Sequence, residues 1–239
     1  MKIRFPMNGK KKMKLLLENF KTFVNEQEQT LPQIYCDMDG VLVDFERGVV
    51  DKINADLQMV RKMADQKNLL KIQNALDKIG RNEVTLADMR GKGATSQPVR
   101  DYMYGRVGGK DEEATTFWAN LPWMPGGKEL WAFIAPYEPH ILTSPMGKGS
   151  QYGKVIWIHE NLGKLSKKQE VNMSHSKSDW ALNENGEPNI LIDDWDKNLG
   201  PWSTHTGGKK GGPYSKYAIQ CANGNYQAAI TKLKDFGFS

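Results

Sequence analysis

The sequence predicts an α/β fold in which a mostly parallel sheet is covered by helices on both faces. Short apolar runs alternate with segments whose apolar residues recur at helical spacing. Three of the four clearest runs end directly in Asp, Thr or Ser, as buried strands do where they lead into a functional loop. The 239 residues, 39% of them hydrophobic, suffice to bury a substantial core in one or two domains.

The apolar runs predict the strands. Four strands are expected at residues 33–36, 140–142, 171–173 and 190–192, and a further short run covers residues 217–220. Each run is too short for a helix and is bounded by Gly, Pro, Asn, Asp or Ser, which is typical of buried strands.

The longer periodic segments predict the helices. Residues 47–79 carry two successive apolar faces, one including Val49, Ile53, Leu57 and Met63 and the next including Leu69, Ile72 and Leu76. Further helices are expected at residues 128–134, 154–162 and 226–233. Residues 91–113, which contain Pro98, and the Gly-rich residues 200–213 are expected to be loops, the first with a short helix.

This order of elements indicates three regions. Residues 1–30 form a basic segment followed by an amphipathic helix with Leu16, Phe20 and Phe23 on one face. Residues 31–45 and 122–239 form the α/β core. Residues 46–121 interrupt the alternation of strands and helices, so we expect them to form a helical cap inserted between the first two strands.

Composition narrows the class of protein. No stretch has the length needed to span a membrane, and Leu15–Leu17 are too few for the core of a signal peptide. Only two cysteines are present, and Cys36 lies within an apolar run, so a reducing cytoplasm is expected. The net charge of +5 indicates either a solvated surface or attraction for anionic substrates. Because the lysines are scattered without interleaved aromatics, nucleic acid is the less favoured partner.

Residues suited to one reaction follow the predicted strands. They are Asp37 and Asp39, Thr143 and Ser144, Lys177 with Ser174 and Ser176, and Asp193 and Asp194. In an open α/β sheet, ligands bind beyond the carboxyl ends of the strands, so these side chains should converge. Clustered carboxylates repel one another unless a hard cation neutralises them, and an all-oxygen set suits Mg²⁺. The four histidines share no metal-ligand spacing, so zinc is not expected.

Four motifs in order resemble those of the haloacid dehalogenase superfamily of phosphatases. The segment Asp37–Phe45 (DMDGVLVDF) resembles the first motif and Ile141–Pro145 (ILTSP) the second. Lys177 resembles the lysine of the third motif, and Ile190–Asp194 (ILIDD) resembles the fourth. Phe45, the Thr-Ser-Pro sequence and residues 157–163 (WIHENLG) are most similar to the 5'(3')-deoxyribonucleotidases, including phage-encoded and bacterial relatives.

The resemblance implies a Rossmann-like core, Mg²⁺ as cofactor and a role for each matching residue. Asp37 would be nucleophile and metal ligand, and Asp39 would be general acid and base and bind the metal through its carbonyl. Thr143, Ser144 and Lys177 would hold phosphate, Lys177 also being catalytic. Asp194, with Asp193 beside it, would complete the metal site, and Phe45 would contact the base. The family also has a phosphate-binding lysine soon after Thr-Ser-Pro; Lys148 is near that place but not in register.

The resemblance therefore implies an enzyme that releases phosphate from a nucleotide, in particular a deoxynucleoside monophosphate, through an aspartyl-phosphate intermediate. We expect it in the cytoplasm, which is the host cytoplasm if the chain is phage-encoded. Phe45 has a second interpretation, as packing between sheet and cap. Two alternatives for the function stay open. The substrate is another phosphate ester (a sugar phosphate, a nucleic-acid end or a signalling nucleotide), or the chain is a non-catalytic protein that binds a phosphate ligand. A homo-oligomer is also compatible with the sequence.

Overall fold

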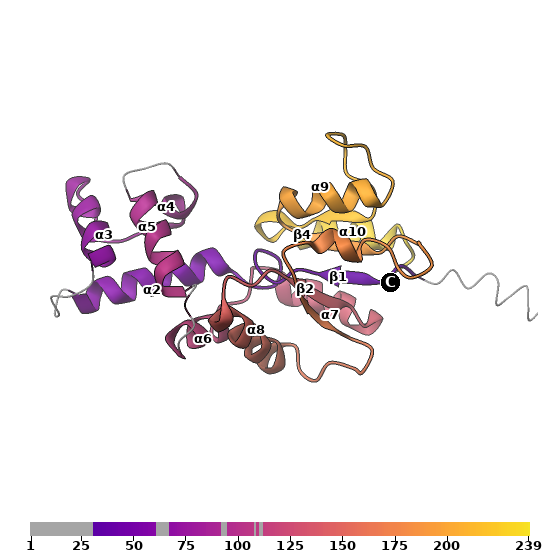
Figure 1. Cartoon of the computed structure of the whole chain (residues 1–239), viewed down its shortest axis with the longest axis horizontal. Helices are drawn as coiled ribbons and strands as arrows, with labels where there is room; N and C mark the ends of the chain where they lie inside the picture. Colours follow the sequence, from indigo (N-terminus) through magenta and orange to yellow (C-terminus); the bar gives the residue numbers. More distant parts are fainter. Residues whose placement is uncertain (1–30, 61–66, 92–94, 108, 110–111) are drawn as a thin grey trace, which may run out of the picture. The chain divides into compact units, whose positions relative to one another are not determined.

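The computed structural model describes residues 31–60, 67–91, 95–107, 109 and 112–239 (Figure 1). The basic segment and helix expected within residues 1–30 lie outside this part of the chain, as does Met63. Within the described residues, no helix has both the length and the apolar character needed to cross a membrane.

A five-stranded parallel sheet forms the centre of the fold, as predicted. Its strands are β1 (Ile34–Cys36), β2 (His140–Thr143), β3 (Val171–Met173), β4 (Ile190–Asp193) and β5 (Ala218–Gln220). The order across the sheet is β3-β2-β1-β4-β5, and each neighbouring pair is parallel. Because β1 lies in the middle, the chain that leaves it emerges between the ends of β2 and β4.

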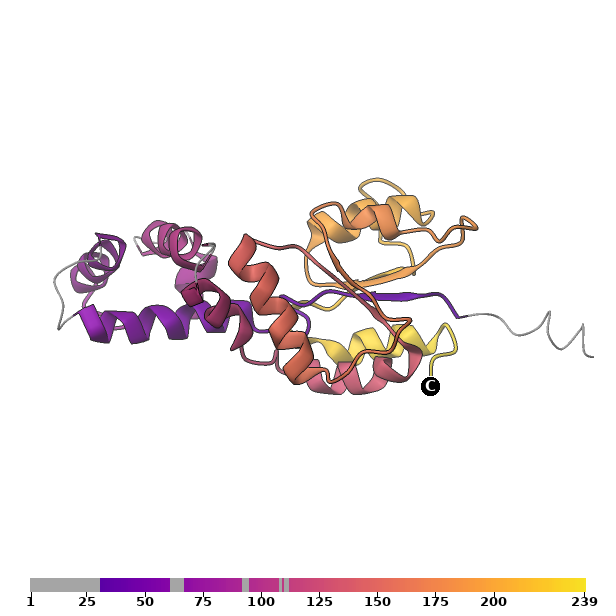
Figure 2. The same cartoon turned by 60° about the horizontal axis from the view of Figure 1, so that its bottom comes forward.

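Alternate residues of β1, β2, β4 and β5 pack into two separate cores, so both faces of this part of the sheet are buried. Ile34 and Cys36 contribute to the core beneath α7 (Gly127–Ile134), α8 (Lys148–Asn161) and α10 (Tyr226–Lys234). Tyr35, which points the other way, packs with Leu199 and Trp202 of α9 (Asp196–His205). Figure 2 shows the sheet between these layers. Burial on both faces explains why the strands appear in the sequence as short unbroken apolar runs.

Helices α2 to α6 separate β1 from β2 in the chain. They are α2 (Phe45–Val60), α3 (Lys67–Lys78), α4 (Leu86–Arg90), α5 (Ser96–Tyr102), which continues as a π-helix over Met103–Val107, and α6 (Glu112–Ala119). The predicted faces of α2 and α3 are buried together: Ile53, Leu57, Leu69 and Ile72 belong to one hydrophobic cluster. This cluster contains none of the strand residues.

Residues 91–113 are more helical than predicted, because α5 and the π-helix occupy much of the expected loop. Pro98 is the third residue of α5, where its missing N–H has no partner within the helix anyway. The buried Tyr102 donates its hydroxyl hydrogen to Asp56 of α2 and so ties α5 to α2. Tyr104, by contrast, is exposed.

Two other boundaries differ from the prediction. α8 begins at Lys148 rather than residue 154, because the Ser150 hydroxyl accepts hydrogen bonds from the amides of Met146 and Gly147 at 2.8 and 3.0 Å. The prediction of a loop from residue 200 is wrong up to residue 205, which lies in α9. Burial of Leu199 and Trp202 outweighs the low helix propensity of Gly200 and Pro201.

Helices α6 and α8 lie side by side, and glycine at position 153 permits their close approach (Figure 1). A Cβ atom on Gly153 would lie 2.4 Å from the Cβ of Trp118 and 2.5 Å from the carbonyl oxygen of Thr115. These contacts are too short for any side chain, so a substitution here must force the two helices apart.

We predict that Gly153→Ala lowers the free energy of unfolding by about 1–3 kcal/mol, the usual cost of overpacking. Gly200→Ala, also within a helix, is the matched control, since a Cβ there meets no atom within 4 Å. It should leave stability unchanged or raise it by about 0.5 kcal/mol or more. Urea unfolding followed by circular dichroism measures both, and equal effects would contradict the close packing.

Candidate active site

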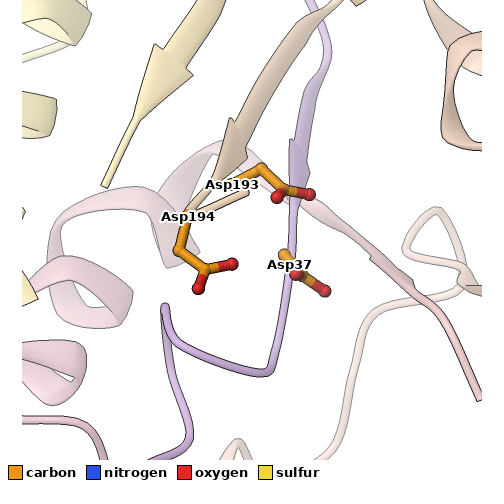
Figure 3. Close-up of side chains that lie close together, drawn as sticks. All are labelled: Asp37, Asp193 and Asp194. Atoms are coloured by element: carbon orange, nitrogen blue, oxygen red, sulfur yellow. The ribbon is translucent and has the colours of Figure 1, made fainter. Parts of the chain in front are cut away.

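Three carboxylates meet where β1 and β4 end. The register pairs Cys36 with Ile192, so Asp37 and Asp193 leave neighbouring strands at the same level. The amide of Asp37 donates to the carbonyl oxygen of Ile192 at 2.9 Å, which extends the ladder by one residue. One oxygen from each of Asp37, Asp193 and Asp194 lies within 4.8 Å of the others, as Figure 3 illustrates.

The loop after β1 is folded tightly against Asp194. The carbonyl oxygen of Met38 accepts hydrogen bonds from the amides of Val41, Leu42 and Val43. Gly40 has a φ of +76°, a conformation that favours glycine. A Cβ at this position would also lie 2.2 Å from Oδ2 of Asp194. The glycine of the DMDG sequence is therefore required twice, for the turn and for the approach of the second acidic pair.

Lys177 lies between two of the carboxylates. Its Nζ is 2.8 Å from Oδ1 of Asp37 and 2.7 Å from Oδ2 of Asp193, and the side chain is almost completely buried. Burial alone would lower the pKa of Lys177, but the charges of Asp37 and Asp193 raise it above its ordinary value. The structure thus brings Lys177 into the cluster as a permanently charged ammonium group.

Asp193 and Asp194 have different surroundings. The carboxylate of Asp193 accepts from Lys177, from the amide of Trp195 and from Asn198 with both oxygens. These bonds fill its acceptor positions, so Asp193 holds Lys177 in place. Asp194 lines the cavity above the sheet and is less buried.

The carboxylate cluster carries more negative charge than Lys177 neutralises. Burial, together with the charge of Asp37, raises the pKa of Asp193 to about 6. Burial and the charges of Asp37 and Asp193 raise the pKa of Asp194 to about 7. A set of oxygen ligands with excess negative charge fits a hard divalent cation, with Asp37 and Asp194 as the side chains best placed to bind it.

Asp39 faces a lysine that was not identified from the sequence. Nζ of Lys154, on α8, lies 2.6 Å from Oδ2 of Asp39. Oδ1 of Asp39 is buried and has no hydrogen-bond partner among the described residues. Burial raises the pKa of Asp39, an effect that the Asp37 charge reinforces and Lys154 opposes. A carboxyl group whose pKa is raised in this way is suited to general acid catalysis.

Lys154, and not Lys148, is the lysine after the Thr-Ser-Pro sequence that reaches this site. It lies in the interior of α8, is completely buried, and also donates to Oγ1 of Thr143 at 2.7 Å and to the carbonyl oxygen of Ser144 at 3.0 Å. Lys148 is exposed at the start of the helix. The sequence feature that could have identified Lys154 is its helical spacing from Ser150 and Trp157, because these three residues share the buried face of α8.

The two hydroxyl residues at the end of β2 differ in their contacts. Thr143 is fully buried and accepts from Lys154. Ser144 lines the cavity, and its hydroxyl donates to the carbonyl oxygen of Ser174 at 2.7 Å. The end of β2 therefore belongs to the same site as the ends of β1 and β4. Thr143 is bonded to Lys154, and Ser144 lines the cavity.

A cavity of about 890 Å³ opens over these groups. Asp37, Asp39, Ser144, Lys177 and Asp194 line its floor. Its walls include Phe45, Glu46, Met89, Arg90 and Tyr104 from α2, α4 and the π-helix, and Trp195 from the segment after β4. A second cavity of about 880 Å³, lined by residues of α2, α6 and the segment after α6, contains none of the candidate residues.

Phe45 has the packing contacts expected from one of the two interpretations made from the sequence, and its contact with a base stays a prediction. Its ring stacks on Trp118 with centroids 4.8 Å apart and an interplanar angle of 11°, and it meets the edge of Phe117. It also lines the cavity. Phe45 is thus a packing residue between α2 and α6 that presents part of its surface to whatever occupies the cavity.

Comparisons with known proteins find similarity only among solved structures. No family model matches the chain, and no curated protein matches it. An L-2-haloacid dehalogenase from Xanthobacter autotrophicus is 15% identical, covering 74% of this chain and 75% of its own, with a TM-score of 0.39. A haloacid dehalogenase-like hydrolase from Burkholderia xenovorans is 12% identical, covering 84% and 97%, with a TM-score of 0.43.

A haloacid dehalogenase-like family protein from Streptococcus pneumoniae is 15% identical, covering 82% of this chain and 91% of its own, with a TM-score of 0.38. At these identities and TM-scores the likenesses assign no activity to this chain. The site geometry is therefore what supports a function.

We predict that the protein binds Mg²⁺ and that Asp194→Asn weakens this binding at least about tenfold, as loss of a direct ligand should. Because the pKa of Asp194 is about 7 without a cation, protons compete below that value. The affinity measured by calorimetry should therefore fall as the pH drops from 8 to 5.5. Asp196→Asn is the control, since Asp196 accepts from Tyr214 and Gln220 instead. Unchanged Mg²⁺ affinity in Asp194→Asn would contradict the assignment.

Proposed function

We propose that this protein is a Mg²⁺-dependent phosphomonoesterase of the haloacid dehalogenase superfamily that acts on a nucleotide. One observation carries the proposal: Asp37 at the end of the central strand contacts Lys177, while Asp39, two residues on, contacts Lys154. Two carboxyl groups, each paired with its own buried ammonium group, border one cavity. They have the environments needed for a nucleophile and for a general acid.

The donor set fits the cation that this chemistry requires. Asp37 and Asp194, and the main-chain carbonyl of Asp39 by the resemblance, would hold Mg²⁺, with Asp193 beside them. When bound, the cation would neutralise the carboxylates and the phosphoryl oxygens and so let two anions approach each other. Lys177 already supplies one positive charge at this place.

The chain's own residues account for the proton and bond changes. A carboxylate oxygen of Asp37 forms a bond to phosphorus while the bond to the ester oxygen breaks, and Asp39 gives its proton to that leaving oxygen. Asp39, now ionised, then takes a proton from water as the water oxygen attacks phosphorus. The bond between Asp37 and phosphorus breaks, which releases phosphate and restores both carboxyl groups.

Oδ1 of Asp37 already accepts hydrogen bonds from the amide of Met38 at 2.7 Å and from Lys177. We therefore assign the attack to Oδ2. Ser144 and Lys177, on the cavity floor, are placed to hold phosphoryl oxygens as their charge develops. Thr143 contributes through Lys154, to which it is bonded.

The cavity supports a nucleotide as substrate. Its volume of about 890 Å³ exceeds what a phosphate group and a sugar need. The exposed aromatic residues Tyr104 and Trp195 both line it, Tyr104 from the helices before β2 and Trp195 from the segment after β4. Exposed rings beside a phosphate site are suited to stack on a planar base. In this proposal the helices of residues 46–121 act as a cap that selects the substrate.

We expect Asp37→Asn to abolish phosphate release from nucleoside monophosphates in the presence of Mg²⁺, because an amide cannot replace the attacking carboxylate. Asp51→Asn, on the exposed surface of α2 and paired with Arg47, should retain full activity. A colorimetric phosphate assay measures both. Release that survives Asp37→Asn would refute the nucleophile assignment.

The choice of substrate is tested with Trp195→Ala. Loss of stacking worth roughly 1 kcal/mol or more should raise KM for a deoxynucleoside monophosphate at least about fivefold. KM for deoxyribose 5-phosphate, which has no base, should not change. Tyr152→Ala is the matched control, since Tyr152 is an equally exposed aromatic residue on α8 outside the cavity. Wild-type activity confined to sugar phosphates would reject the nucleotide.

A further inference from the structure

Trp118 of α6 lies between the cavity wall and the lysine that contacts Asp39. One face of its ring stacks on Phe45, and Nζ of Lys154 lies 4.9 Å from the ring centroid. The Trp118 side chain is almost completely buried, and its Nε1 donates to the carbonyl oxygen of Val107 at 2.7 Å. The ring is therefore held by a hydrogen bond at one edge and by packing on Phe45.

Lys154 depends on its neighbours for its position. An ammonium group has three N–H donors, and in Lys154 they reach Oδ2 of Asp39, Oγ1 of Thr143 and the carbonyl oxygen of Ser144. A Lys side chain has four rotatable bonds, and these contacts are kept only if the chain is confined. The Trp118 ring provides this confinement and attracts the charge through its π-electrons.

The main chain also favours this arrangement. Gly153, the residue before Lys154, has no room for a side chain because the Cβ of Trp118 would lie 2.4 Å away. The α8 backbone at the lysine is thus pressed against Trp118. A shift of α6 relative to α8 would move the lysine and the carboxyl group bonded to it.

We propose that Trp118 is a positioning residue for the acid–base step: it orients Lys154, which orients the Asp39 carboxyl group. Since Phe45 lines the cavity and stacks on Trp118, the same contacts link the cavity wall to that carboxyl group. The inference rests on the proposed function, because it assigns a purpose to Asp39 as proton donor. Trp118 itself is not among the residues that line the cavity.

A misplaced Asp39 affects some substrates more than others. The Asp39 proton goes to the leaving oxygen as the bond between phosphorus and that oxygen breaks. An alkyl phosphate, whose alkoxide is a poor leaving group, needs this proton. p-Nitrophenyl phosphate needs it far less, because nitrophenolate is stable as an anion. The ratio of the two rates therefore reports on proton donation and is insensitive to a general loss of folded protein.

The experiment compares kcat for a deoxynucleoside 5'-monophosphate, an alkyl phosphate, with kcat for p-nitrophenyl phosphate in four proteins: wild type, Trp118→Leu, Trp118→Phe and Trp202→Leu. Trp118→Leu removes the π face, whereas Trp118→Phe keeps an aromatic face and loses only the bond to Val107. Trp202 is the matched control: it is equally buried, and its Nε1 also donates to a main-chain carbonyl oxygen, that of Asn189 at 3.1 Å.

We expect Trp118→Leu to lower kcat for the deoxynucleoside monophosphate at least about tenfold more than kcat for p-nitrophenyl phosphate. General acids usually contribute more than this factor to a rate. Trp118→Phe should restore most of this difference, and Trp202→Leu should show none. Equal losses on both substrates in Trp118→Leu, or the same ratio in Trp202→Leu, would overturn the proposal. A wild-type protein that hydrolyses neither substrate would reject the proposed function instead.

A second measurement does not require catalysis. The ring current of Trp118 should shift the side-chain CH₂ resonances of Lys154 upfield in a ¹H–¹³C spectrum, assigned by their loss in Lys154→Arg. Trp118→Phe should keep part of this shift, and Trp118→Leu should abolish it and change the carboxyl carbon resonance of Asp39. Unchanged Lys154 and Asp39 resonances in both Trp118 variants would show that the ring does not position them.

Discussion

Three carboxylates lie close together at the ends of two central strands of a parallel sheet, and the rest of the site depends on this constraint. Asp37, Asp193 and Asp194 are brought together by strand pairing, which leaves them no freedom to separate. The buried Lys177 offsets part of their repulsion. Burial and the repulsion among the carboxylates raise the pKa values of Asp193 and Asp194. A divalent cation would relieve that repulsion, which is the electrostatic reason that the site fits one.

Within this site, the four Asp residues differ in their hydrogen-bond partners. Asp193 has its oxygens filled and anchors Lys177, whereas Asp194 faces the cavity. Asp37 and Asp39 are only two residues apart, yet each contacts a different lysine. In the proposed function, differences in hydrogen bonding among four neighbouring carboxyl groups therefore separate the nucleophile, the acid, the metal ligand and the support, although all four residues are Asp.

Packing between α6 and α8 extends this arrangement beyond the sheet. Gly153 lets the helices approach, and the aromatic residues Phe45 and Trp118 fill the space between the cavity wall and Lys154. A substrate that contacts Phe45 thus touches a group that packs on the support of the acid. In the proposed function, substrate recognition and proton transfer therefore share side chains, although recognition depends on the helices before β2 and proton transfer on the sheet.

The strands, the parallel sheet, and the acidic and hydroxyl groups at the strand ends could be predicted from the sequence alone. The reason is that strands buried on both faces appear as short apolar runs that end in polar residues. The sequence did not reveal Lys154, the π-helix after α5 or the helical conformation of residues 200–205 in α9. Burial of a lysine is decided by partners such as Asp39, which lies 115 residues away. Likewise, Gly200 and Pro201 are helical because Leu199 and Trp202 pack on one face of the sheet. Tertiary packing, and not local helix propensity, therefore determined the extent of α9.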